Sequence, residues 1–144
     1  MTRGGPLEAS CRQVFEDLAY MICDPMDDSS LFSEQDEILE AEISWSGDRS
    51  GSLLAAGSKE LFELLARMAT GEESGGVSSE QALSELINIV CGLYLHAVAP
   101  GAMAEIGLPA VRATTSASWG NLAESQNLCI IRVEHMPFVI KVDG

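Results

Sequence analysis

The fold is decided by the stretch Gln81-Ala82-Leu83-Ser84-Glu85-Leu86-Ile87-Asn88-Ile89-Val90-Cys91-Gly92, which has the spacing of a long helix. At about 100° per residue, one stripe of this helix and its continuation is mainly apolar and consists of Leu83, Leu86, Ile87, Val90, Tyr94 and Ala97. The opposite stripe consists of Gln81, Glu85, Asn88, Gly92 and His96. Residues three or four apart on a helix are neighbours, with roughly 5–6 Å between their Cβ atoms. The spacing therefore predicts that the Glu85 carboxylate and the Asn88 amide lie side by side on the face that does not anchor the helix.

This helix is expected to begin at Ser78 or Ser79 and to end near Val98, before Pro100-Gly101. A first helix is predicted over residues 7–23 and is ended by Asp24-Pro25. Its expected core face is Leu7, Cys11, Val14, Phe15, Leu18 and Ile22. A second helix starts after Ser58 as N-cap and ends near Thr70-Gly71. Its core face is expected to comprise Leu61, Phe62, Leu64, Leu65 and Met68.

Strand signals fill most of the remaining chain. Residues 38–45 and 52–56 predict a hairpin around the turn residues 46–51. Four later segments favour strands, namely 108–115, 116–123, 128–134 and 138–142, with a turn at Glu134-His135, whereas residues 102–106 suggest one more helical turn. The order predicts an α+β fold with an antiparallel-rich sheet. A length of 144 residues favours a single domain over residues 1–144.

The charge and hydropathy of the chain exclude some classes of binding partner. The net charge of −14 argues against nucleic acid and against an anionic membrane surface. No uninterrupted apolar run approaches the roughly 20 residues that span a bilayer, and residues 1–6 lack the apolar core of a signal peptide. A cytoplasmic protein is therefore the default expectation.

Metal and thiol chemistry is not expected. The cysteines, Cys11, Cys23, Cys91 and Cys129, form no Cys-x-x-Cys pair and are interpreted as free thiols. The acidic segment 24–36 has no Asp-x-Asp-x-Asp-Gly pattern, so a solvated loop is favoured over a calcium site. His96 is interpreted as a surface or interface residue, and Trp45 and Trp119 as core or subunit-contact residues.

The Glu85–Asn88 pair suggests hydrolysis of a phosphate that another molecule holds. An Asn amide does not titrate, but it can fix a water by accepting and donating hydrogen bonds. A Glu can grip a cation, and phosphoryl transfer needs mainly alignment and charge neutralisation. The sequence has no Gly-x-x-x-x-Gly-Lys run and no basic cluster, so a self-contained hydrolase is not expected.

Gly92 suggests a docking surface. A glycine inside a helix costs roughly 1 kcal/mol relative to alanine, and this one lies a turn after Asn88 in the same stripe. Ile89 and Leu95 flank the stripe, and apolar edges around a polar centre are typical of interfaces. The alternative is that another element of the same domain, or a second subunit, covers these flanks.

Taken together, these residues resemble the CheX-like branch of the CheC/CheX/FliY phosphatases, which dephosphorylate response regulators such as CheY. The family motif is an Asp or Ser, three residues, Glu, two residues, Asn, and a Pro some twenty residues later. Glu85, Asn88 and Pro109 match it, and Gly92 matches a Gly that usually follows the Asn by four residues. The resemblance implies the CheC/CheX-like fold, in which the antiparallel-rich sheet packs with the long motif-bearing helix and two further helices.

The resemblance also implies a mechanism in trans. The regulator supplies the phospho-aspartate, its Mg²⁺ and a Lys, so the chain needs no cofactor or metal of its own. Asn88 would align the attacking water, and Glu85 would pair with the regulator's Lys. Gln81, Gly92 and Pro109 would contact the partner, and a homodimer is expected.

Gln81 departs from the Asp or Ser of the motif. Ser78-x-x-Gln81 also fits a helix capping box, in which the Gln side chain reaches back to the Ser78 amide. Two further functions therefore stay open beside the phosphatase: a non-catalytic CheX-like binding module for a signalling protein, and a dimeric scaffold with no regulator partner.

Overall fold

The computed structural model describes residues 5–25, 32–33, 36–70, 78–115, 119 and 128–143. Its helices are α1 (Pro6–Ala19), α2 (Lys59–Thr70) and α3 (Ser79–Val98). Its strands are β1 (Cys23–Pro25), β2 (Ile38–Gly47), β3 (Gly51–Ser58), β4 (Ala104–Ile106), β5 (Ala110–Thr114), β6 (Leu128–Val133) and β7 (Met136–Asp143). The α+β fold predicted from the sequence is confirmed.

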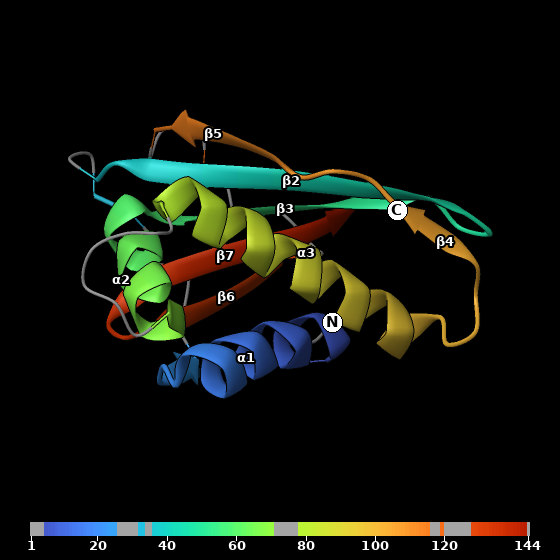
Figure 1. Ribbon diagram of the computed structural model, residues 1–144, viewed down its shortest axis with the longest axis horizontal. Coiled ribbons are helices and arrows are strands. Elements are labelled where there is room, and N and C mark those ends of the chain that lie inside the picture. The colour runs from blue at the N-terminus through green and yellow to red at the C-terminus, as the bar shows by residue number, and fades with distance from the viewer. Residues whose placement is uncertain are drawn as a thin grey trace.

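The strands of the described residues form one antiparallel sheet in the order β1-β6-β7-β3-β2-β4, and β5 also pairs with β2. In this order β3 lies between β7 and β2, and β2 lies next to the edge formed by β4 and β5. Figure 1 shows α3 crossing the sheet beside β2. The expected hairpins at 38–56 and 128–142 are confirmed, and Glu134-His135 forms the second turn.

The three helices share one hydrophobic core with one face of the sheet. Alternate residues of β2, such as Leu39, Ala41 and Ile43, are buried in this core together with residues of α1, α2 and α3. The other face of the sheet carries a smaller cluster in which Trp119 packs with residues including Ile38 and Ile130. Both predicted core tryptophans, Trp45 and Trp119, are buried.

The first helix is shorter than the predicted 7–23. Tyr20 adopts a left-handed conformation with φ 55°, and its amide donates to the Phe15 carbonyl, which ends α1 at Ala19. Cys23 to Pro25 then form strand β1, so the prediction that Asp24-Pro25 ends a helix was wrong. Ile22 is 67 % exposed instead of part of the core. The side chain of Leu18, which was also assigned to the core, lies outside the described residues.

Residues 102–106 form no helical turn, contrary to prediction. Asp48 lies at the turn of the β2–β3 hairpin and makes two hydrogen bonds with Met103. The Met103 backbone amide donates to the Asp48 carboxylate at 3.0 Å, and the Asp48 backbone amide donates to the Met103 carbonyl at 3.0 Å. These bonds hold residues 103 and 104 at the edge of β2, where Gly47 pairs with Ala104. A tertiary contact therefore decides the conformation of this segment.

Other expectations on the helices are largely confirmed. The Leu61 amide donates to the Ser58 Oγ at 3.1 Å, as predicted for an N-cap. Met68 and Ala97 were expected on core faces but are exposed. Apart from Trp119, the predicted strand 116–123 lies outside the described residues, as does most of the acidic segment 24–36.

α3 is the one helix in the described part of the chain that could cross a bilayer by length and hydropathy. The sequence did not indicate this property, because polar residues interrupt every apolar run within the helix. A helix packed in a protein core meets the same criteria, and α3 packs against α1, α2 and β2.

All four cysteines are buried thiols that form no disulfide, as predicted. Burial raises the pKa of Cys23 and of Cys91, in each case to about 11. The raised pKa disfavours the thiolate form, which is the nucleophilic form of a cysteine. Among the described residues, no group of three or more His, Cys, Asp or Glu side chains is arranged to hold a metal ion.

Candidate functional site

α3 starts with a complete capping box. The Gln81 backbone amide donates to the Ser78 Oγ at 3.1 Å, and the Ser78 backbone amide donates to the Gln81 Oε1 at 3.0 Å. Within the same turn, the pKa of Glu80 is lowered because its own backbone amide, and then the Ser79 hydroxyl, donate to the carboxylate. The predicted capping role of Gln81 is thus confirmed, and this reciprocal pair fixes where α3 begins.

Replacing Ser78 with alanine is expected to lower the free energy of unfolding by about 1 kcal/mol, the typical value of a lost N-cap. The Gln81 amide would lose its acceptor, and the first turn of α3 would fray. Urea unfolding of wild type and Ser78→Ala would measure the difference. Gln13→Ala, an exposed change in the interior of α1, serves as the control and should change the free energy by less than about 0.5 kcal/mol. Equal effects in both variants would contradict the role of the cap.

Glu85 and Asn88 are both exposed on α3. The opposite side of the helix is buried through Leu83, Leu86, Ile87 and Val90, so the helix is held in one rotational setting. With a separation of three residues, the two side chains are neighbours on the helix surface. Within the described part of the chain, neither makes a hydrogen bond or ion pair, which leaves both polar groups available to a second molecule.

Gly92 continues this surface one turn later. A Cβ built at Gly92 would meet no atom within 4 Å, and the flanking Ile89 and Leu95 are half-buried. The open space argues against cover by another described element of the same chain, which was one of the alternatives. We use the term α3 stripe for Gln81, Glu85, Asn88 and Gly92.

Pro109, the last of the predicted partner-binding residues, lies in a β-bulge at the sheet edge. Trp45 pairs with Ile106 and Glu42 pairs with Ala110. Between these two pairs β2 contains residues 43–44, whereas the edge strand contains residues 107–109, which is one residue more. Since Pro has no amide donor, an edge-strand bulge is one of the few places in a sheet that accept it.

The edge strand after the bulge is anchored by a buried carboxylate that the sequence did not single out. Glu40, on β2, is buried, lies 2.5 Å from the Arg112 Nε on β5, and accepts a hydrogen bond from the Trp119 Nε1 at 3.1 Å. Three different segments meet at this carboxylate, so no local spacing in the sequence could have indicated it.

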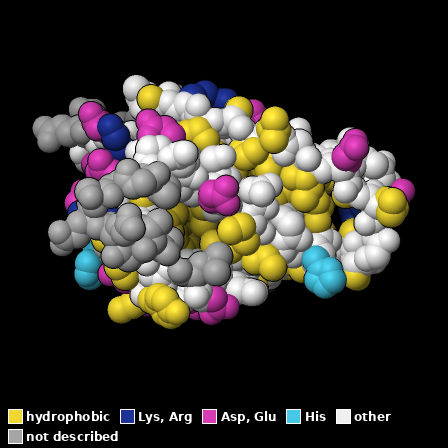
Figure 2. All heavy atoms as spheres, in the orientation of Figure 1, with side chains coloured by type: hydrophobic (Ala, Val, Ile, Leu, Met, Phe, Trp, Pro, Cys, Tyr) yellow, Lys and Arg dark blue, Asp and Glu magenta, His cyan; other side chains and the backbone are white. Residues whose placement is uncertain are grey.

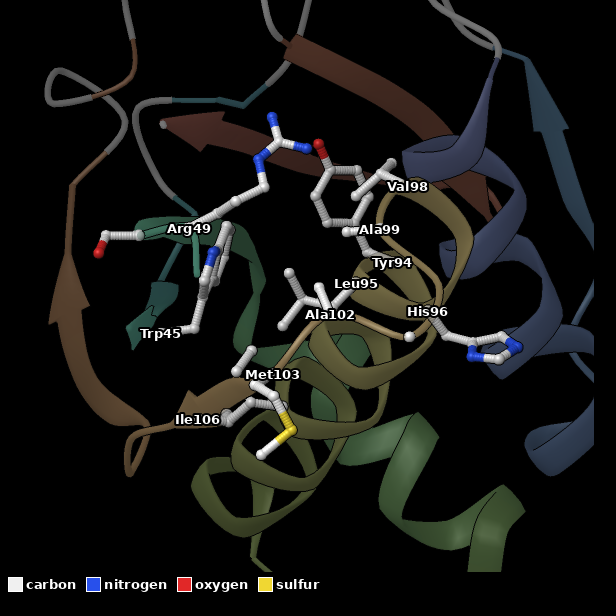
Figure 3. Close-up of a pocket in the computed structure, with 13 residues that line it drawn as sticks. Trp45, Arg49, Tyr94, Leu95, His96, Val98, Ala99, Ala102, Met103 and Ile106 are labelled. Atoms are coloured by element: carbon white, nitrogen blue, oxygen red, sulfur yellow. The ribbon is translucent and has the colours of Figure 1, made fainter. Parts of the chain in front are cut away.

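A cavity of about 240 Å³ lies at the far end of α3 and was also not predicted. Trp45, Tyr94, Leu95, Met103 and Ile106 contribute to its lining (Figure 3). The rings of Trp45 and Tyr94 are 6.3 Å apart, and the imidazole of His96 points away from the other labelled side chains (Figure 3). Glu85 and Asn88 do not line this cavity and are exposed on the surface of α3.

The antiparallel sheet and its helical layer give the chain the fold of the CheC/CheX-like class of α+β proteins. The family profile described as "Chemotaxis phosphatase CheX" matches residues 40–132, and the chain belongs to this family. The match includes most of β2, both predicted catalytic residues and Pro109. No curated protein sequence matches the chain significantly.

Solved structures agree on the fold. CheX from Vibrio vulnificus is similar with a TM-score of 0.69 and 16% identity, over 99% of this chain and 98% of that one. CheX from Desulfovibrio desulfuricans has a TM-score of 0.65 and 14% identity, over 95% of each chain. A chain of the CheX–CheY–BeF3–Mg²⁺ complex from Borrelia burgdorferi has a TM-score of 0.65 and 16% identity, over 96% of this chain and 94% of that one.

Proposed function

We propose that this protein is a phosphatase that removes the phosphoryl group from the phospho-aspartate of a CheY-like response regulator. The observation that carries the proposal is the pair Glu85 and Asn88, exposed side by side on α3 in a chain of the CheX family. The CheX–CheY complex from Borrelia burgdorferi supports a CheY-like receiver domain as the partner.

Asn88 is the residue that aligns the attacking water. Its amide both accepts and donates hydrogen bonds, so it can hold a water in one orientation without changing its own charge. Phosphoryl transfer is catalysed largely by alignment and by electrostatic stabilisation. Asn88 supplies the alignment, and the regulator supplies the phospho-aspartate and the Mg²⁺ that neutralises its charge.

The segment that carries the proposed site is acidic. From Ser78 to Val111 the sequence contains three glutamates, Glu80, Glu85 and Glu105, and neither Lys nor Arg. A phosphoryl group could not be held by these residues alone, because binding a phosphate requires positive or amide donors. The reaction therefore requires the regulator's own active site.

Glu85 is the residue that fixes the docked arrangement by pairing with a Lys of the regulator. Replacing Glu85 with glutamine keeps the size of the side chain and removes its charge. We expect KM for the phosphorylated regulator to rise about tenfold, the equivalent of 1.4 kcal/mol. Measuring KM at low and high ionic strength checks the cause: the salt dependence of KM should be weaker in Glu85→Gln than in wild type. An unchanged KM with an unchanged salt dependence would contradict the ion pair.

A second candidate is a binding module without catalytic activity. It is favoured by one observation: the side chain of Gln81, which replaces the Asp or Ser of the family motif, is engaged with the Ser78 amide. Such a protein would bind the regulator without accelerating phosphate release. A dimeric scaffold with no regulator partner would do neither.

The remaining attributes follow from the same proposal. We propose a cytoplasmic homodimer that serves two-component signalling, with no cofactor of its own. Pro109 and the α3 stripe form its regulator-binding surface. Neighbouring genes for chemotaxis or two-component proteins would support the first two functions over the scaffold.

The test is a phosphate-release assay with the receiver domains of the same genome. Each receiver is phosphorylated with a small phosphodonor, the donor is removed, and substoichiometric protein is added. Faster release from one receiver, with many turnovers per molecule of protein, supports the phosphatase. Binding without acceleration would support the module, and neither effect with any receiver would overturn both.

A further inference from the structure

The β-bulge between β4 and β5 exposes an apolar side chain. Leu108, in the middle of the bulge, is 93 % exposed, and the neighbouring Ile106 is 37 % exposed. Bulges redirect side chains that would otherwise alternate across a sheet. Figure 2 shows hydrophobic side chains gathered between α3 and the segment that joins β4 to β5. A single exposed leucine is ordinary, but an exposed leucine in a patch beside polar site residues is typical of an interface.

The bulge is held in place by contacts on both sides. The Gly107 amide donates to the Ser44 carbonyl at 2.8 Å, and Pro109 fixes its own φ. After the bulge, Arg112 is paired with the buried Glu40. Leu108 is therefore presented from a backbone that is already ordered, so binding to it costs little additional conformational entropy.

The patch adjoins the α3 stripe and has a defined charge. β5 and β2 both pack against α3, and the chain between β4 and β5 follows the edge of β2 (Figure 1). Residues 78–111 contain three glutamates and no Lys or Arg, and Arg112, which follows them, is already paired with Glu40 and Glu42. The complementary partner therefore presents basic side chains next to an apolar one. The lysine-bearing active-site surface of a receiver domain has this character, which makes it the occupant we favour over a second copy of this acidic chain.

We propose that Leu108, together with Ile106, is the apolar anchor that seats the receiver domain while the α3 stripe enters its active site. Pro109 is then a positioning residue, because it stabilises the bulge that exposes Leu108. This inference rests on the proposed function and adds a specificity-determining contact to it. Anchors of this kind carry a large share of the binding energy of an interface.

The test separates docking from catalysis. In Leu108→Ser, the Kd for a beryllofluoride-activated receiver and the KM for the phosphorylated receiver should both rise about tenfold. The kcat at saturating receiver should stay within about twofold, because Leu108 does not touch the reacting atoms. Leu108→Met keeps an apolar side chain and should restore affinity to within about threefold of wild type.

Met103→Ser is the matched control. Met103 is also apolar and 76 % exposed, but it lies before β4 and outside the bulge, so this change should leave Kd and KM unchanged. Circular dichroism confirms that each variant is folded. Wild-type affinity in Leu108→Ser, or equal losses in both serine variants, would overturn the anchor while the phosphatase stands. A wild-type protein that neither binds nor dephosphorylates any receiver would overturn the function and the anchor together.

Discussion

Asn88→Ala is expected to lose the acceleration of phosphate release, so that the regulator loses its phosphoryl group at its own slower rate. The expected loss is about 10²-fold, the low end of what one well-placed group contributes to such a reaction. A water held by the Asn88 amide is already oriented for attack, whereas with alanine it must be oriented from bulk solvent. Single-turnover phosphate release with excess protein measures this loss directly.

The fold should not change in this variant. Asn88 is exposed, makes no hydrogen bond or ion pair within the described structure, and is replaced by a better helix former. Ser84→Ala, a polar-to-alanine change on the same helix outside the α3 stripe, is the control and should retain the wild-type rate. Full acceleration by a folded Asn88→Ala would show that the water is aligned by some other group.

Phe138→Ala is expected to destabilise the protein by about 3–5 kcal/mol. Phe138 is buried on β7, and its ring contacts Phe15 of α1 edge-to-face at 5.1 Å and Phe62 of α2 at 6.4 Å. Its loss leaves a cavity where the sheet meets two helices and removes two aromatic contacts. Because domains of this size are stable by about 5–15 kcal/mol, the change is a large fraction of the total.

Urea unfolding of Phe138→Ala and wild type measures this difference. Arg132→Ala, an exposed change on the adjacent β6, is the control and should shift the free energy of unfolding by less than about 0.5 kcal/mol. A loss below about 1 kcal/mol in Phe138→Ala would contradict the packing of α1 and α2 on β7.

α3 could be predicted from the sequence because its signals are local. Its apolar residues repeat over several turns, and Ser78 with Gln81 forms a capping box. Local spacing was therefore sufficient to place Glu85 and Asn88 together on the exposed side of the helix. The β2–β3 hairpin was likewise encoded by β-favouring residues on either side of a turn.

The features that could not be predicted depend on residues far apart in the sequence. β1 exists because Cys23 to Pro25 pair with β6, more than 100 residues later in the chain. The strand conformation of residues 104–106 depends on Asp48 and on pairing with β2. A propensity-based prediction has no access to these pairings.

The same limit applies to the candidate site. Pro109 was predicted as a contact residue, but the bulge that contains it is apparent only from the register of β4 and β5 on β2. The sequence did not indicate a role for Leu108, because an apolar residue after a glycine is ordinary in a strand. Its exposure indicates an interface only because the fold places it beside the α3 stripe.

The most direct test of the central claim is a titration of isotope-labelled protein with its beryllofluoride-activated receiver, followed by NMR. We expect the largest chemical-shift changes at the amides of residues 81–92 and 106–108, with little change along α1. The unactivated receiver should give the same pattern at higher concentrations. Shift changes confined to other surfaces, with residues 81–92 unperturbed at saturation, would contradict the claim that Glu85 and Asn88 enter the active site of a regulator.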